Sequence, residues 1–537
     1  MDSQKIVNAA VICILIILTL SGCGGGGGGG GEEPASSPVY PTPATIFSDS
    51  FVDGADWSSR WTHYDESGNG DSWAVVNGQL LQSSFLENNA LQGTTSYHTG
   101  AFVVLVDPPV YTLPASYRFS VDVTPLPNPA SSTSEGNDVG IMFRYQNPQN
   151  YYRVSMSAKF GFTRFEKRKG DVFETLAVNS IGYVDGNAMT LTAEVSGDTI
   201  IVWIDGDPVF AVKDTNPISS GTIALYCQDQ AQFDNVLITE NPLQPTVAIS
   251  SPLAYSIALT PDDGTTLSVE AVVLNTPAGG SVVFSRDGVS KPASAISGNV
   301  YSVSFTGVPN GNHTVTAVLR YADGTEADVD INSTVGTGGD YYVTLGDSIT
   351  NGVGDEIDSN NDSTDGRIVS IQGYQARLAN LLTTETGRPQ IVFNEGIEGE
   401  RALEAVDRID SILDRHPGAN KVLVLIGTND SLDGVAPAAF GGSLTTIANT
   451  IVTDSKKVWI AKILPTNPPD LNPTRDTLIQ NYNLQIIGIT DTVGDSIFLG
   501  PDLYADFYGQ PSLYTGDVHP NDSGYQLMAN KWADPLP

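Results

Sequence analysis

The chain has 537 residues, enough for three or four domains of ordinary size. Hydrophobic residues make up 40% of it, so packed cores can form and a wholly disordered chain is excluded. The net charge of −35 repels phosphate backbones, so no nucleic-acid partner is expected. Three cysteines are too few for a disulfide framework.

Residues 1–22 have the pattern of an export signal. Lys5 precedes an apolar run from Ile6 to Leu20, which is short for a membrane-spanning helix. The run leads into Leu20-Ser21-Gly22-Cys23, which resembles the bacterial lipobox, and this resemblance implies cleavage before Cys23 and lipidation of its thiol. More than one acyl chain on this residue makes the anchor stable. The alternative is an ordinary signal peptide with a chance cysteine.

Residues 23–45 are predicted to form a flexible tether. The unbroken run Gly24–Gly31 is followed by Glu, Pro, Ser and Thr up to about Thr45, a composition that cannot bury anything. In lipoproteins generally, a glycine after the lipidated cysteine suggests an outer-membrane or cell-surface destination. Membrane contact is expected through the lipid anchor only, because no second apolar segment is long enough to span a bilayer.

Residues 46–241 are predicted to form one large β-sandwich. Tyr117–Val123 and Tyr151–Lys159 alternate apolar and polar residues, as strands with one buried face do. Asp205-Gly206-Asp207 separates two further strands, which is typical of a tight hairpin. Short strands without any helical period favour a sandwich over other folds.

Two segments of this region, FSDSFVDGADWSSRWT and EVSGDTIIVWIDGDPVF, resemble concanavalin-like and laminin-G-like domains. Domains of those families often bind glycans, sometimes with calcium. The resemblance makes Trp57, Trp61 and Trp73 candidates for a sugar-stacking surface. The alternative is that the three are core aromatics, since a fold by itself does not assign a ligand.

Residues 244–336 are predicted to form a second, smaller β-sandwich. Asn310-Gly311 and Asp323-Gly324 are turn signals within it. The spacing resembles a bacterial immunoglobulin-like module, which implies a spacer role, and Val335–Gly339 has the composition of a linker. The expected strands are Pro245–Ile249, Thr266–Leu274, Gly280–Ser285, Val300–Phe305 and His313–Arg320.

Residues 340–537 change to an alternation of apolar strands and helical stretches, which predicts a three-layer α/β/α domain with a parallel sheet. Ligands of such sheets bind at the carboxyl ends of the strands. The expected strands are Tyr341–Leu345, Gln390–Phe393, Lys421–Ile426, Lys457–Leu464 and Ser496–Leu499. The expected helices are Tyr374–Thr384, Glu400–Arg415, Pro437–Asp454, Asp476–Val493 and Asn521–Trp532.

Four polar blocks fall at the predicted active edge of this sheet. Gly346–Thr350 (GDSIT), Asn394–Gly399 (NEGIEG) and Gly427–Asp430 (GTND) each follow a strand, and Gly516–Asn521 (GDVHPN) precedes the last helix. The four blocks in this order resemble the GDSL, or SGNH, hydrolases, over residues from about 341 to 533. The resemblance implies a flavodoxin-like hydrolase domain that needs no cofactor.

A serine hydroxyl is a weak nucleophile until a base removes its proton. His519 lies at the active edge, whereas His416 precedes the third strand and is expected at the opposite edge, on the surface at a helix C-terminus. Ser348 is therefore the candidate nucleophile and His519 the candidate general base.

The resemblance also implies an oxyanion hole made of the backbone N–H groups of Ser348 and Gly399 and the side-chain amide of Asn429. Such donors stabilise the negative charge that forms on the carbonyl oxygen. Asp347 and Asp430 are expected to fix loops in their blocks, and Gly396 is expected to be a turn residue.

The orienting acid departs from the family pattern. The family places it three residues before the histidine, but that position is Gly516 here, and Asp517 lies two before. Asp517 is the preferred candidate because Gly516 allows a sharp bend. Asp502, Asp506 or a Ser–His dyad are the alternatives.

An acidic insertion, Asp355–Gly366, follows the nucleophile. Asp358, Asn360 and Asp362 have the spacing of a calcium loop, but Ser363 replaces its turn glycine and Val369 its bidentate glutamate. A solvated loop is favoured over a metal site.

Together these features predict an exported lipoprotein esterase that hydrolyses carboxylic esters through an acyl-serine intermediate. A glycan-binding-like domain on the same chain favours acylated, especially acetylated, carbohydrate as the substrate. The alternatives are a broad-range short-chain or aryl esterase or a lipase, an O-acyltransferase, and a non-catalytic surface adhesin that binds glycans.

Overall fold

The computed structural model describes residues 38–536, apart from 53–55, 69, 85, 87–99, 107–112, 127–137, 159, 171, 229, 356–371, 468–471, 493–495 and 517. Some predicted residues lie outside the described part of the chain: Cys23, Asp358, Asn360, Asp362 and Asp517. Among the described residues, no helix is long and apolar enough to cross a membrane.

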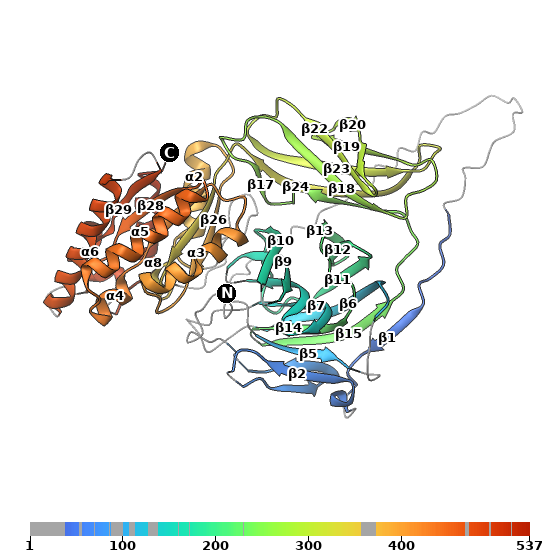
Figure 1. Cartoon of the computed structure of the whole chain (residues 1–537), viewed down its shortest axis with the longest axis horizontal. Coiled ribbons are helices and arrows are strands. Elements are labelled where there is room, and N and C mark those ends of the chain that lie inside the picture. Colours follow the sequence, from blue (N-terminus) through green and yellow to red (C-terminus); the bar gives the residue numbers. More distant parts are fainter. Residues whose placement is uncertain are drawn as a thin grey trace, which may run out of the picture. The chain divides into compact units, whose positions relative to one another are not determined.

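The first region is a β-sandwich of two antiparallel sheets, as predicted (Figure 1). One sheet has the order β13-β12-β11-β6-β15-β4-β3, with β1 also paired to β15, and the other has the order β10-β9-β8-β7-β14-β5-β2. The first sheet consists of β1 (Thr45–Asp49), β3 (Trp73–Val76), β4 (Gln79–Gln82), β6 (Ser116–Pro125), β11 (Met189–Ser196), β12 (Thr199–Ile204), β13 (Asp207–Lys213) and β15 (Ala231–Thr239). The second consists of β2 (Trp61–Asp65), β5 (Ala101–Leu105), β7 (Val139–Asn147), β8 (Asn150–Ser157), β9 (Phe162–Lys169), β10 (Val172–Asn179) and β14 (Thr222–Cys227).

Alternation along the strands builds the core of this sandwich. In β6, Phe119 and Val121 point inward and are fully buried, while the residues between them are half-buried. The hairpin between β12 and β13 turns at Asp205 and Gly206, which both have positive φ. That conformation suits the twist of a two-residue hairpin, so this turn fixes the register of the two strands.

The tryptophan candidates do not form a sugar-stacking surface together. Trp61 is buried in the core, and its indole Nε1 donates to a carboxylate oxygen of Asp49 at 2.9 Å. Trp57 and Trp73 are partly buried and pack against the same core. The core alternative therefore holds for Trp61, because a fully buried indole has no free face for a ligand.

The second region is also a sandwich of two sheets. The strands of one sheet are β16 (Thr246–Ser251), β18 (Leu267–Leu274), β21 (Ser294–Ser297) and β22 (Val300–Phe305). Those of the other are β17 (Ile257–Leu259), β19 (Ser281–Arg286), β20 (Val289–Pro292), β23 (Gly311–Arg320) and β24 (Glu326–Thr337). All five expected strands are present.

The end of this second sandwich differs from the sequence expectation. Val335–Gly339 was expected to be a linker, but β24 continues to Thr337 and pairs with β23, and Val335 is fully buried. The glycine and threonine residues of this segment are typical of a linker. The residues at the start of β24 are charged and partly exposed, so they did not indicate a strand that continues into it. The connection to the third region is therefore short.

The third region is the predicted three-layer α/β/α domain (Figure 1). Its parallel sheet has the order β26-β25-β27-β28-β29. The strands are β25 (Tyr341–Gly346), β26 (Ile391–Gly396), β27 (Lys421–Leu425), β28 (Lys457–Lys462) and β29 (Ile497–Asp502). Helices α2 (Gln375–Thr386) and α8 (Asp522–Ala533) pack on one face, and α3 (Ala402–Arg415), α5 (Pro437–Thr453) and α6 (Pro473–Thr492) pack on the other.

Several short elements at the carboxyl edge of this sheet were not expected from the sequence. They are the helices α1 (Ser348–Asn351), α4 (Thr428–Asp433) and α7 (Leu503–Phe507), and the paired strands β30 (Tyr514–Thr515) and β31 (His519–Pro520). Their four to six helical residues, or two strand residues, are too few to produce a periodic pattern. They hold most of the candidate site residues.

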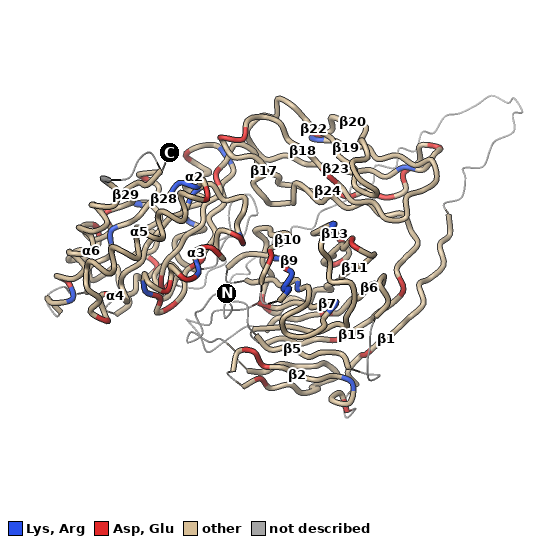
Figure 2. Tube along the Cα trace, in the orientation of Figure 1, with Lys and Arg blue, Asp and Glu red and all other residues tan. Residues whose placement is uncertain are grey.

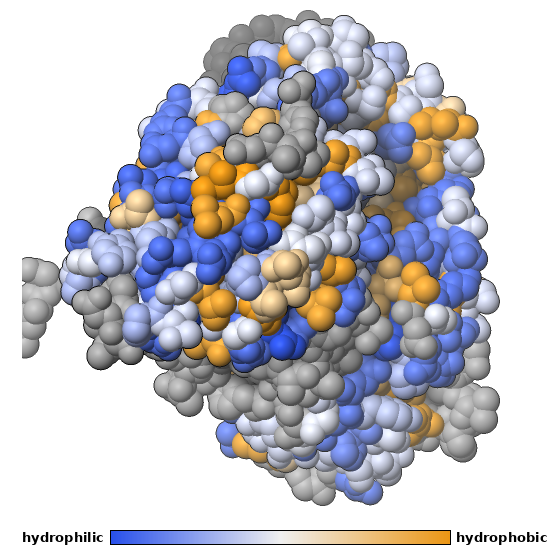
Figure 3. Space-filling view, turned by 60° about the vertical axis from the view of Figure 1, so that its left-hand side comes forward, coloured by the Kyte–Doolittle hydropathy of each residue, from blue (hydrophilic) through white to orange (hydrophobic). Residues whose placement is uncertain are grey.

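Acidic residues are as widespread in the structure as the net charge of −35 suggests. Figure 2 shows acidic residues in each of the three regions. On the face drawn in Figure 3, hydrophobic residues lie in small groups among hydrophilic ones.

Candidate active site

The structure brings Ser348 and His519 together. The hydroxyl oxygen of Ser348 lies 2.9 Å from Nε2 of His519, although the two residues are 171 positions apart in the sequence. Ser348 opens α1, one residue after the end of β25, and it is 7% exposed. His519 lies in β31, directly before α8. A hydroxyl and an imidazole at this distance form the hydrogen bond that a nucleophile and its general base require.

Local interactions place Ser348 at the start of a helix. The carboxylate of Asp347 accepts a hydrogen bond from the backbone N–H of Ile349 at 2.9 Å and so caps α1. A Cβ at Gly346 would overlap the Thr350 side chain and the Leu425 carbonyl, so only glycine fits before the cap. The N–H of Ser348 belongs to the first turn of the helix, where backbone N–H groups have no partner within the helix. It is thus suited to bind an anion.

His519 is held from two sides. Gly354 packs against it, because a Cβ on this glycine would lie 3.2 Å from Cβ of His519. The phenol of Tyr525, on α8, donates to the Val353 carbonyl at 2.8 Å and ties this loop to the helix. Asn521 caps α8 by accepting from Gly524 at 3.1 Å. These contacts hold the backbone of His519 next to the loop that follows α1.

The two other expected oxyanion donors lie on neighbouring segments. Gly399 follows β26 in a turn with φ of +73°, and Asn429 lies in α4, the next helix after β27. The Asn429 amide nitrogen donates to the Glu400 carbonyl at 2.9 Å. An amide carries two hydrogens, so the second remains for a developing oxyanion. The turn after β26 thus sets the direction of the amide.

Gly396 has a different role from the one expected. It is the last residue of β26 and has no positive φ, so it is not a turn residue. A Cβ at this position would overlap the backbone nitrogen of Asn351, in the helix that begins with Ser348. The side-chain amide of Asn351 donates to the Gly396 carbonyl at 3.2 Å. Close approach of α1 to β26 requires a glycine here.

We predict that Gly396→Ala lowers kcat/KM for a soluble ester by at least about tenfold. The added methyl group displaces α1 and its Ser348, and misplacement of a catalytic group by about 1 Å costs on the order of a hundredfold. Gly442→Ala is the matched control, because a Cβ at Gly442 meets nothing within 4 Å. Equal activity of the two variants would contradict this account.

Asp347 is a fully buried carboxyl group beside the nucleophile. Burial raises the pKa of Asp347 to about 7, and the negative charge of Glu400 adds to this rise, whereas the Ile349 N–H and Thr428 oppose it. Below about pH 7 the side chain is therefore neutral. A neutral Asp347 places no negative charge beside the site where the oxyanion forms.

We predict that Asp347→Asn changes the pH dependence of stability. The unfolded carboxyl group ionises near pH 3.8 and the folded one near 7, so the wild type loses stability as the pH rises between these values. Asparagine does not titrate. Relative to the wild type, the variant should gain about 1–3 kcal/mol between pH 5 and pH 8, at about 1.4 kcal/mol per unit. Calorimetry of the full chain at both pH values checks this, and an unchanged difference between the two proteins would refute it.

Two of the alternative orienting acids are engaged elsewhere. Asp502 caps α7 by accepting from Ala505 at 3.1 Å and forms an ion pair with Lys462 at 2.5 Å. Asp506 forms an ion pair with Lys531 at 2.8 Å. Both therefore have a structural role. The preferred candidate, Asp517, remains a prediction from the sequence.

His416 is not the surface residue that the sequence suggested. It caps α3, but it is only 4% exposed. Its Nε2 lies 2.7 Å from a Glu395 carboxylate oxygen, and its Nδ1 lies 2.7 Å from the Tyr341 hydroxyl. Burial lowers the pKa of His416, so we assign a neutral ring that donates from Nε2 and accepts at Nδ1. The expectation failed because Glu395, on β26, supplies a buried acceptor.

We predict that Asp517→Asn lowers kcat by several orders of magnitude, because the imidazole loses the acid that fixes its tautomer and stabilises its charged form. Asp502→Asn and Asp506→Asn should change kcat less than about threefold. Steady-state kinetics on one soluble ester compares the three. A large loss in either control with a mild effect of Asp517→Asn would reassign the acid, and three mild effects would indicate a Ser–His dyad.

Two family models match parts of the chain. The GDSL-like lipase/acylhydrolase family matches residues 344–527, which include Ser348, Gly399, Asn429 and His519. The 3-keto-alpha-glucoside-1,2-lyase-like domain matches residues 47–239, the first sandwich. No curated protein matches the chain.

Solved structures are similar to separate parts of the chain. The acetylxylan esterase Axe2 of Geobacillus stearothermophilus is 18% identical, with 36% of this chain and 91% of that chain covered and a TM-score of 0.30. A putative lipolytic protein of the G-D-S-L family from Desulfitobacterium hafniense is 17% identical, with 36% and 99% covered and a TM-score of 0.28. The carbohydrate-binding module CBM66 of Bacillus subtilis is 18% identical, with 34% and 95% covered and a TM-score of 0.27. Values this low carry no functional argument.

Proposed function

We propose that this chain removes acyl groups from carbohydrate at the cell surface. The premise is that residues 344–527 form a GDSL-like lipase/acylhydrolase domain, and so a carboxylic ester hydrolase. The observation that carries the proposal is the 2.9 Å contact between the Ser348 hydroxyl and His519 Nε2. Lipidation of Cys23 would hold the protein at the membrane, with residues 23–45 as its tether.

The reaction follows from the positions of the side chains. Nε2 of His519 takes the proton of the Ser348 hydroxyl while its oxygen attacks the ester carbonyl carbon. The negative charge on the carbonyl oxygen is met by the N–H groups of Ser348 and Gly399 and by the Asn429 amide; loss of one such donor typically costs about 10²–10³ in kcat. The proton on His519 then passes to the leaving alcohol, which departs and leaves an acyl group on Ser348.

Water completes the cycle by the same route. His519 takes a proton from a water molecule, whose oxygen attacks the acyl carbon. The tetrahedral intermediate collapses, the proton returns to the Ser348 oxygen, and the carboxylic acid leaves. The residues named here need no metal or redox group for these steps.

Two observations favour carbohydrate as the alcohol part of the ester. The first sandwich matches a family whose name refers to a glucoside, so a domain of a kind associated with sugars occurs on the same chain. Gly399 is exposed and His519 and Asn429 are half-buried, so the edge of the site is open to solvent. An open edge admits a bulky alcohol such as a sugar chain.

We predict that the full chain releases acetate from acetylated xylan or another acetylated glycan. It should prefer these to p-nitrophenyl esters of eight or more carbons by at least about tenfold in kcat/KM. Ser348→Ala is the control, and it should lower the rate by several orders of magnitude, as removal of a nucleophile does. Acetate release is measured in an enzyme-coupled assay. A preference for the long-chain esters would contradict the substrate class, and full activity of Ser348→Ala would contradict the mechanism.

A further inference from the structure

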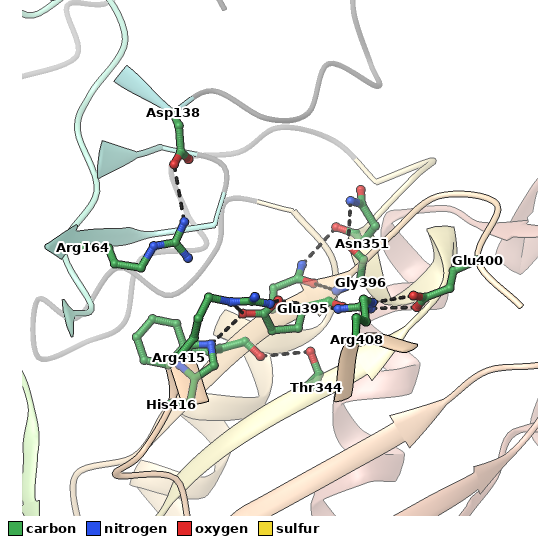
Figure 4. Close-up of polar contacts among 12 residues, drawn as sticks. Asp138, Arg164, Thr344, Asn351, Glu395, Gly396, Glu400, Arg408, Arg415 and His416 are labelled. Carbon is green, nitrogen blue, oxygen red and sulfur yellow. Dashed lines mark hydrogen bonds and ion pairs between the residues drawn. The ribbon is translucent and has the colours of Figure 1, made fainter. Parts of the chain in front are cut away.

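A buried ion pair lies directly behind the turn that carries Gly399. Glu400, the residue after Gly399, is fully buried, and its partner Arg408 is 3% exposed. Nη2 of Arg408 donates to one carboxylate oxygen of Glu400 at 2.7 Å, and Nε donates to the other. Figure 4 shows the two parallel contacts of this fork. A bidentate pair of this kind fixes orientation as well as distance.

Arg408 connects three elements of the hydrolase domain. It belongs to α3, and its Nη2 also donates to the backbone carbonyl of Glu395 in β26 at 2.6 Å. The same guanidinium thus ties the helix, the strand and the turn between them together (Figure 4). The turn cannot shift along the strand without breaking these bonds.

Glu400 transmits this restraint to the oxyanion donors. Its carbonyl accepts the hydrogen bond of the Asn429 amide at 2.9 Å, and its peptide nitrogen is bonded to the carbonyl carbon of Gly399. One side chain therefore restrains the peptide next to the Gly399 N–H and also the acceptor that orients Asn429. The N–H of Glu400 closes the turn by donating to the Ile397 carbonyl at 3.3 Å.

Stability alone does not account for such a pair. The cost of removing two charges from water often exceeds their attraction, and well-packed apolar residues of similar size are frequently as stable. A fork of hydrogen bonds fixes the relative position of its two side chains, which an apolar contact does not. The pair lies at a turn on whose position the oxyanion hole depends.

We propose that Glu400 and Arg408 are positioning residues of the oxyanion hole, which hold the Gly399 N–H and the Asn429 amide in the geometry that the transition state needs. This inference rests on the proposed ester hydrolysis at Ser348. It assigns no direct contact with substrate to either residue.

The test is the double variant Glu400→Gln/Arg408→Met of the full chain, which removes both charges and so leaves no buried charge without its partner. We expect kcat on a soluble ester to fall about 10–100-fold with KM changed less than threefold. The inhibition constant of a boronic acid, which forms a tetrahedral adduct with serine, should rise by a similar factor. Rates are divided by the fraction of protein that a fluorophosphonate labels once labelling has reached completion, so that misfolded protein does not count and a slower labelling rate does not distort the result.

The matched control is Asp340→Asn/Lys421→Met. This pair is also buried, with a 2.8 Å contact and side chains 8% and 5% exposed, but it lies at the amino ends of β25 and β27, away from the site. The control should keep kcat within threefold. A similar loss of kcat in both double variants, or a loss in neither, would overturn the inference.

A measurement without substrate separates this inference from the proposed function. Hydrogen–deuterium exchange of residues 397–401 should become at least about tenfold faster in Glu400→Gln/Arg408→Met than in the wild type. Unchanged exchange would overturn the inference even if the wild type hydrolysed every ester tested. A wild type without turnover would overturn the proposed function, and the positioning role would fail with it.

Discussion

The close approach of Ser348 to His519 is the constraint on which the rest of the hydrolase domain depends. Two residues 171 positions apart meet at 2.9 Å because β25 ends where α1 begins and because the short strand β31 lies beside that helix. Gly346 and Gly396 have no side chains, which lets α1 approach both neighbouring strands. The parallel register then brings the segments after β26 and β27 to the same edge. The parallel sheet therefore brings the residues of the site together.

Buried charge is the second feature that shapes this edge. A negative group beside a developing oxyanion opposes catalysis, and Asp347 and Glu400 are the chain neighbours of two expected oxyanion donors, Ser348 and Gly399. Burial keeps Asp347 neutral below about pH 7, and the Arg408 guanidinium compensates the charge of Glu400. Glu395, near the carboxyl end of β26, is treated in the same way: burial opposes its ionisation, but Arg415 and His416 outweigh burial and hold the pKa of Glu395 well below the usual range. Asp347 is thus neutral, and Glu400 and Glu395 are each paired with an arginine.

The sequence predicted the features that a local pattern encodes. Apolar runs such as Lys421–Ile426 predicted the layers of the hydrolase domain, and the blocks around Ser348 and His519 predicted the edge of the site. The match to the GDSL-like family model confirms the resemblance that these blocks carry. Features that depend on tertiary contact were missed. Nothing in the sequence shows that Arg408 reaches back to Glu400, or that Glu395 buries His416. Gly396 was predicted to be a turn residue because its requirement for glycine comes from α1, whose Asn351 lies 45 positions away in the sequence.

The central claim is that Ser348 is a nucleophile activated by His519. The most direct test is treatment of the full chain with a fluorophosphonate probe, followed by mass spectrometry of its peptides. The account predicts one adduct, on Ser348, and a labelling rate at least about a hundredfold lower in His519→Ala, because the hydroxyl then lacks its base. An adduct on another serine, no adduct at all, or unchanged labelling in His519→Ala would contradict it.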